Sequence, residues 1–245
     1  MNNKVKVAFF ADMLVENFDG ASRTIFQIIK RINKEKFEFF FICGEPPKSN
    51  FEFKYYVVPS IDIPKNEDYK IAIPALSFFE LNNAMTIFKP DVIHISSPSF
   101  LGRYAVDYGH WHQIPVITIY HTHFISYIDY YFKDIKFLIE PVKSFVISRN
   151  RSLYNGCKTI LVPAPSLIEE LESYGFMRSK MKLWRRGMNT NLFSPSKRNN
   201  NLKFSSKPIV LFVSRLVWEK NLKTLAEVYK INEEKGCIFD IVIAG

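Results

Sequence analysis

The sequence predicts an α/β protein in which parallel strands form a doubly wound sheet with helices on both faces. Short, almost continuously apolar runs such as Val5–Phe10 and Phe37–Cys43 alternate with segments of helical periodicity, such as Ile25–Ile32. A strand covered on both faces reads as a continuous apolar run, because neither face meets water. Repeated alternation of strands and helices is typical of a parallel sheet. A third observation is the polar, basic stretch Ser194–Pro208, which lacks apolar periodicity and separates two such regions.

The individual elements follow from these patterns in chain order. Strands are expected at Val5–Phe10, Phe37–Cys43, Tyr55–Val58, Asp91–Ile95, Pro115–Tyr120, Lys158–Val162, Met181–Trp184, Ile209–Val213 and Phe239–Ile243. Helices are expected around Ile25–Ile32, Leu81–Phe88, Leu101–Tyr108, Ile135–Leu153, Ser166–Leu171 and Leu222–Lys235. Pro141 is expected to bend the longest helix, and Ser166 with Glu169 suggests a capping box. Sheets of this kind bind ligands at loops beyond the carboxyl ends of their strands.

The stretch 194–208 is interpreted as a linker between two domains. Residues 1–193 supply enough strands and helices for one complete doubly wound domain. Residues 209–245 supply only a strand, a helix and a strand, which cannot bury both faces of a sheet. The second domain is therefore expected to be incomplete and to continue beyond Gly245.

Composition places the chain among ordinary globular proteins. Of its 245 residues, 47% are hydrophobic and 23% are charged. No apolar run reaches the roughly 18 residues that a membrane-spanning helix needs, and the N-terminus does not read as a signal peptide. Cys43, Cys157 and Cys237 lie far apart, which fits the reduced thiols of a cytoplasmic protein.

The charge of the chain indicates attraction to an anionic partner. The formal net charge is +9 and the pI is about 9.3. Nucleic acid, an acidic lipid surface and a phosphorylated small substrate would all fit this charge. No nucleic-acid-binding motif is visible, so nucleic acid is not expected as a partner. The many Lys and Asn residues are also typical of AT-rich genomes, which leaves a compositional origin of the charge open.

The loop after the first strand ends in Asp19 and Gly20 at the start of a helix. Glycine lets a backbone approach a bulky ligand closely, although glycine in this position is also common as a simple turn residue. The sequence has no G-x-G-x-x-G fingerprint, so binding of a nicotinamide or flavin cofactor is not supported.

The second candidate loop carries His121 directly after a buried strand, where its side chain is expected to enter the cleft beyond the sheet. His121 and His123 form a pair that can suggest zinc, but no third ligand has suitable spacing and no metal is expected. A packed or solvated histidine is the alternative. His94 is expected to be buried in its strand, and His110 and His112 to be exposed at a helix end.

The third candidate loop carries Arg215 and Lys220, between the strand Ile209–Val213 and the helix that follows. Two cations beside the free N–H groups of a helix N-terminus form an anion site, most often for phosphate. A solvated surface pair is the alternative, but the position between strand and helix favours the anion site.

Together these segments resemble the retaining glycosyltransferases of family 4, which have the GT-B fold of two Rossmann-like domains. The similarity extends over the whole chain and rests on four blocks in the family's order. They are the N-terminal strand and glycine loop Val5–Thr24, the middle block Pro90–Ile95 with Pro98–Gly102 and Pro115–Thr122, the interdomain signature Leu183–Pro195, and the donor-diphosphate loop Val213–Asn221. The middle block and the tyrosines after it are most similar to members that glycosylate lipids, such as mannosyl- and sulfoquinovosyl-transferases.

The resemblance implies transfer of a hexose from a GDP- or UDP-linked sugar to a lipid or glycan acceptor, with retention of configuration. Arg215 and Lys220 would hold the diphosphate, His121 would contact the donor sugar near the reacting carbon, and Gly20 would let its loop close over the phosphates and the acceptor. No metal or other cofactor is implied, because the cations and a helix dipole take its place. The protein would act peripherally at the cytoplasmic face of the membrane, attracted to anionic lipid.

The sequence also departs from the family pattern. Asp19, Ser214 and Asn221 stand where the family usually has glycine, and its later acidic motif would lie beyond Gly245. The 245-residue chain is therefore expected to be inactive by itself. A non-catalytic membrane- or anion-binding module of the same fold is an alternative interpretation, as is another nucleotide-sugar enzyme such as an epimerase.

Overall fold

The chain divides into two compact units. The computed structural model describes residues 4–48, 50–63, 66–132, 135–185, 187–197, 206–214, 216–217 and 220–244. One unit contains residues 1–128 and 135–186, and the other contains residues 129–134 and 187–245. The expected linker 194–208 falls in the second unit, and residues 198–205 of that linker lie outside the described residues.

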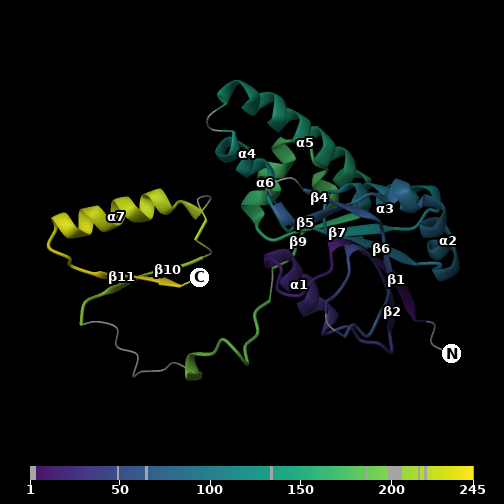
Figure 1. The fold of residues 1–245 in the computed structure, drawn as a ribbon, viewed down its shortest axis with the longest axis horizontal. Helices are drawn as coiled ribbons and strands as arrows, with labels where there is room; N and C mark the ends of the chain where they lie inside the picture. Colours follow the sequence, from purple (N-terminus) through teal and green to yellow (C-terminus); the bar gives the residue numbers. More distant parts are fainter. Residues whose placement is uncertain are drawn as a thin grey trace. The chain divides into compact units, whose positions relative to one another are not determined.

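The first unit is built on a parallel seven-stranded sheet in the order β3-β2-β1-β6-β7-β8-β9 (Figure 1). From β1 the chain adds β2 and β3 on one side of the sheet. It then returns and adds β6, β7, β8 and β9 on the other side. The strand order therefore reverses between β1 and β6, which confirms the doubly wound sheet. The strands are β1 (Val5–Met13), β2 (Phe37–Glu45), β3 (Lys54–Val57), β6 (Val92–Ile95), β7 (Val116–Ile119), β8 (Thr159–Val162) and β9 (Met181–Leu183).

Helices cover both faces of this sheet (Figure 1). Side chains along β1 alternate between two cores, as the pleat of a strand requires. Phe9 and Ala11 pack with α1, whereas Ala8 and Phe10 belong to the larger core with α2, α3, α5 and α6. The helices are α1 (Gly20–Ile29), α2 (Phe78–Phe88), α3 (Phe100–Trp111), α4 (Ile125–Tyr131), α5 (Ile139–Gly156) and α6 (Pro165–Ser173), with short 3-10 turns η1 (Pro74–Ser77), η2 (Lys136–Leu138) and η3 (Arg178–Lys180).

Two expectations about helix ends are wrong. The long helix does not begin near Ile135 with Pro141 in its interior, because α5 begins only at Ile139 and the proline falls in its first turn. A proline there costs no helical hydrogen bond, since the first N–H groups have no partner within the helix. The capping box at Ser166 is also absent: α6 has Pro165 in its first turn, and its N-cap is Ala164 without a side-chain hydrogen bond.

An antiparallel hairpin, which the sequence analysis did not predict, follows β3. It consists of β4 (Ser60–Ile63) and β5 (Asn66–Ala72). Lys70 pairs with Glu45 at 2.8 Å, and the ring of Tyr69 lies 5.7 Å from that of Phe18 in the loop after β1. The hairpin therefore packs beside the carboxyl ends of β1 and β2.

The second unit contains β10 (Ile209–Val213), α7 (Leu222–Glu234) and β11 (Asp240–Ala244), besides the 3-10 turn η4 (Pro195–Lys197). The two strands pair in parallel, which confirms the expected strand–helix–strand. Asn232 of α7 is buried, and its amide nitrogen donates to the carbonyl of Phe239 at 2.8 Å. This bond fixes the end of the helix against the start of the second strand.

We expect Gly102→Ala to lower the free energy of unfolding by about 1–3 kcal/mol, because overpacking forces the backbone to shift. A Cβ atom at Gly102, in the first turn of α3, would lie 2.2 Å from the carbonyl oxygen of Ser97. The matched control is Gly20→Ala in the first turn of α1, where a Cβ atom meets nothing within 4 Å. Urea unfolding followed by circular dichroism measures both, and equal midpoints for the two variants would contradict the expected close approach.

Candidate functional site

The candidate site lies at the carboxyl ends of β1, β6 and β7, which are neighbours in the sheet. Three loops leave this edge: 14–19 leads to α1, 96–99 leads to α3, and 120–124 leads to α4. The strand order reverses between β1 and β6, so the loops on either side of that point diverge. Ligands of open α/β sheets bind in the crevice that such a reversal leaves.

Gly20 opens α1 at this edge. Asp19 is the N-cap, and its Oδ1 accepts from the backbone N–H of Ser22 at 2.7 Å, while the Asp19 N–H donates to the Ser22 hydroxyl at 2.8 Å. Gly20 itself is exposed, and space is open where a side chain would project. The helix therefore presents the backbone of its first turn without an obstructing side chain, as expected for a loop that approaches a ligand.

Asp12, near the end of β1, is a buried carboxylate that the sequence analysis missed. Its Oδ2 accepts from the Ser97 hydroxyl at 2.5 Å, which ties β1 to the loop after β6. Among the described residues, no hydrogen-bond partner is present for its Oδ1. Burial raises the pKa of Asp12, and the hydroxyls of Ser97 and Ser99 act in the opposite direction. A carboxylate at the end of an otherwise apolar strand was the signal that could have revealed it.

His121 leaves β7 beside His94 of β6. His94 is only 7% exposed, as expected, and its ring lies 4.3 Å from that of Phe9. Burial, with a smaller contribution from the positive charge of His121, lowers the pKa of His94 to about 3. His94 is therefore neutral at physiological pH and adds no positive charge beneath His121, which is itself half-buried. His110 and His112 are exposed, as predicted from their place at a helix end.

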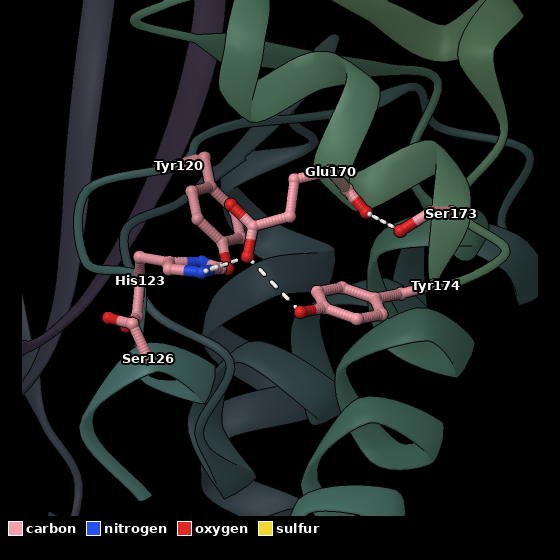
Figure 2. A network of polar contacts seen from close by, with 6 residues as sticks. All are labelled: Tyr120, His123, Ser126, Glu170, Ser173 and Tyr174. Carbon is pink, nitrogen blue, oxygen red and sulfur yellow. Dashed lines mark hydrogen bonds and ion pairs between the residues drawn. The ribbon is translucent and has the colours of Figure 1, made fainter. Parts of the chain in front are cut away.

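The second histidine of the loop, His123, has a protein partner at each ring nitrogen (Figure 2). The Tyr120 hydroxyl lies 3.0 Å from Nδ1, and the Glu170 carboxylate of α6 lies 3.0 Å from Nε2. A zinc ion bound by His121 and His123 would have to displace one of these partners. No group of three or more His, Cys, Asp or Glu suited to a metal ion is found in the part of the chain that the structure describes.

Lys220 lies on the turn between β10 and α7, as the sequence predicts, and is exposed. Asn221 follows it with φ of 59°, in the left-handed region, and forms the N-cap of α7. This conformation explains why glycine is usual at that position, and asparagine tolerates it better than most other residues. Arg215 lies outside the described residues.

Gly20 and His121 thus share one edge of the first unit, and Lys220 occupies the strand-to-helix turn of the second.

No helix within the described ranges is long and apolar enough to cross a bilayer.

Comparison with known proteins identifies the family. The model of Glycosyltransferase Family 4 matches residues 18–192, which is most of the chain and includes both Gly20 and His121. The chain belongs to glycosyltransferase family 4.

Curated relatives agree with this assignment. A GDP-mannose-dependent alpha-mannosyltransferase of Corynebacterium glutamicum is 26% identical over 235 residues, covering 91% of this chain and 54% of the relative. The sulfoquinovosyl transferase SQD2 of Arabidopsis thaliana is 30% identical over 148 residues, covering 58% of this chain and 28% of that protein. The chain thus spans about half the length of the curated mannosyltransferase it matches.

Solved structures show the same fold. HepE of Anabaena, in complex with UDP, superposes with a TM-score of 0.59 at 12% identity, over 99% of this chain and 70% of HepE. Sucrose-phosphate synthase of Thermosynechococcus elongatus gives 0.58 at 14% identity, over 99% of this chain and 71% of that structure. These structures are GT-B glycosyltransferases, so the expected GT-B fold is confirmed for the family 4 chain.

We expect His94 to make the stability of the protein fall in acid. Its pKa is about 3 when folded, against 6.5 ordinarily. Between pH 6.5 and about pH 3 the unfolded chain therefore binds a proton at His94 that the folded chain does not bind. The stability that is present above pH 6.5 is lost as the pH falls toward 3. The slope is at most about 1.4 kcal/mol per pH unit.

Urea unfolding of the wild type and of His94→Gln measures this effect at a series of pH values. The advantage of the wild type over the variant should shrink as the pH falls below neutrality. A pH-independent difference for His94→Gln would mean that His94 titrates normally.

Proposed function

We propose that this chain is part of a retaining glycosyltransferase that moves a hexose from a nucleotide-diphosphate sugar to a lipid or glycan acceptor. The observation that carries the proposal is His121, which lies at the switch-point edge of a sheet within the segment matched by the family. The matched mannosyltransferases are GDP-mannose-dependent, so GDP-mannose is the first donor to test. In this proposal residues 1–193 form the acceptor-side domain, 194–208 a linker, and 209–245 the start of the donor-side domain.

The roles of the residues follow from their positions. Lys220, with Arg215, would hold the diphosphate at the start of α7, where free backbone N–H groups also favour an anion. His121 would contact the donor sugar near the reacting carbon, and Gly20 would let the α1 loop close over the phosphates and the acceptor. Two cations and a helix N-terminus stabilise charge on a leaving diphosphate, so the proposed reaction requires no metal.

The proposed lipid acceptor requires contact with a membrane, and the region from η2 to α5 offers a suitable surface. Phe137 and Phe145 are 79% and 66% exposed, and the exposed cations Lys136 and Arg149 accompany them. Phe145 and Arg149 are four residues apart and so lie on one face of α5. Helix α2 also exposes two aromatic side chains, Phe78 and Phe79, but its only charged residue is acidic. Aromatic residues interleaved with cations fit the headgroup layer of an anionic bilayer at the cytoplasmic face.

We expect Lys220→Ala to weaken donor binding roughly tenfold or more, because a charge-assisted hydrogen bond to phosphate contributes about 1.5–3 kcal/mol. We expect His121→Ala to lower kcat roughly a hundredfold, as loss of one transition-state donor does elsewhere. Both are measured with GDP-mannose and UDP-glucose on the longest native chain that contains these residues, with membrane lipid as acceptor. Lys223→Ala, an exposed lysine one turn further along α7, is the matched control.

The outcomes separate the alternatives. If Lys220→Ala and Lys223→Ala bind every donor equally, the proposed diphosphate site is wrong. If the protein binds lipid while neither donor binds nor reacts, a non-catalytic membrane-binding module replaces the transferase.

We expect the double variant Lys136→Glu with Arg149→Glu to lower partitioning onto anionic vesicles by about tenfold or more, since each cation near the surface contributes about 1 kcal/mol. Co-sedimentation with phosphatidylglycerol vesicles measures it. The control is Lys36→Glu with Lys158→Glu, which makes the same charge change at two exposed lysines before the amino ends of β2 and β8. Equal losses in both double variants would show that only net charge matters and would refute the proposed surface.

A further inference from the structure

His123 bridges two parts of the first unit that are far apart in the sequence. Its Nδ1 lies 3.0 Å from the hydroxyl of Tyr120, and its Nε2 lies 3.0 Å from Oε1 of Glu170, 47 residues away (Figure 2). The Tyr174 hydroxyl donates to the same carboxylate oxygen at 3.1 Å. The imidazole is thus held on both sides, and Glu170 is in turn held by a neighbour on its own helix turn.

One end of this bridge is buried in the core, and the other lies on a helix packed against it. Tyr120 is 1% exposed, and its ring lies 5.3 Å from that of Tyr154 of α5. The Glu170 side chain is exposed, but α6, which carries it, packs on the core through the buried side chains Ile168 and Leu171. The polar contacts therefore connect the end of β7 to α6, with His123 between them.

The proton positions agree with this arrangement. Burial, and then the charge of Glu170, raise the pKa of Tyr120, so its phenol keeps its proton. In the tautomer with its proton on Nε2, the imidazole accepts from that phenol at Nδ1 and donates to the Glu170 carboxylate, which also accepts from Tyr174. Each donor in the bridge meets an acceptor.

The backbone of His123 continues the restraint into α4. Its carbonyl oxygen accepts from the backbone N–H of Ser126 at 3.2 Å and from the Ser126 hydroxyl at 2.8 Å. These bonds join His123 to the first turn of α4. His121 lies only two residues upstream, between the end of β7 and the restrained His123.

We propose that Tyr120, His123 and Glu170 form a clamp that fixes the conformation of the 120–124 loop and thereby the orientation of His121. Its consequence for sugar transfer rests on the proposed function. His123 is a positioning residue and not a catalytic one, because both ring nitrogens are occupied by protein partners and neither is available to a substrate. Tyr120 and Glu170 act through His123 in the same way.

The test observes His121 directly, without using activity. Histidine ring resonances of ¹⁵N-labelled protein are recorded for the wild type, His123→Ala, Tyr120→Phe and Glu170→Gln, and His121 is assigned by its loss in His121→Ala. We expect the His121 signals to shift and broaden in His123→Ala and Tyr120→Phe. Glu170→Gln should have the smallest effect, because an amide oxygen still accepts from Nε2–H. The matched control is Glu169→Gln, an exposed neighbour on the same helix, which should leave His121 unchanged.

Hydrogen exchange shows whether a change in the His121 signals comes from loss of order in the 120–124 loop or only from a changed charge nearby. The amides of residues 124–128 should exchange faster in His123→Ala than in the wild type, and at the wild-type rate in Glu169→Gln. Unchanged His121 signals in both His123→Ala and Tyr120→Phe would overturn the clamp, as would equal shifts in Glu169→Gln. If His123→Ala does not fold, Tyr120→Phe decides, because it removes only the hydroxyl that contacts Nδ1 of His123.

Kinetics on a transfer-competent chain connect the clamp to catalysis. We expect kcat to fall roughly ten- to a hundredfold in His123→Ala, because a small displacement of a reacting group has effects of that size, while donor KM stays nearly constant. A rise in KM alone would assign the clamp to binding and overturn its role in orienting His121. Absence of transfer by the wild type would refute the proposed function, and the His121 resonances would still decide the clamp.

Discussion

Parallel pairing of β1, β6 and β7 is the constraint on which the first unit depends. Parallel strands must be covered on both faces, so apolar side chains fill both sides of β1 and polar groups appear only near the strand ends. All strands of such a sheet end at the same edge. The segments that carry Gly20, Ser97 and His121 therefore lie at one edge of the sheet because of the strand order, although 101 positions of sequence separate Gly20 from His121.

Two groups at this edge are retained although they cost stability. Asp12 and His94 are both buried, and each has one polar atom without a hydrogen-bond partner in the described part of the chain. Burying an unsatisfied polar group is unfavourable, so a sequence optimised only for stability would place apolar residues there. Asp12 instead links β1 to the loop after β6 through Ser97, and neutral His94 adds no positive charge near His121. Such local conflicts are expected where a site constrains the fold.

Most strands of the sheet could be predicted from the sequence, because a strand buried on both faces is a short run of consecutive apolar residues. The positions of His121 and Lys220 follow from those strands, since each comes at or shortly after a strand end. The clamp could not be predicted, because the partner of His123 is Glu170, whose sequence context is an ordinary amphipathic helix. The N-cap of α6 was predicted wrongly for a local reason. Pro165 takes the first helical position, so Ser166 lies inside the helix and does not cap it.

The short sheet of the second unit leaves several apolar side chains exposed. Leu211 and Val213 of β10 are 59% and 70% exposed, and Ile243 of β11 is 50% exposed. Parallel strands are stable when both faces are covered, so these exposed apolar side chains weaken the second unit taken by itself. Lys220 is exposed beside this short sheet, and a cation acts more strongly on a phosphate in a less polar environment. The proposed binding of a diphosphate by Lys220 therefore depends on shielding of this sheet from water. The proposed clamp on His121 instead lies within the first unit, where Tyr120 is buried and the exposed Glu170 is carried by a helix packed on the core.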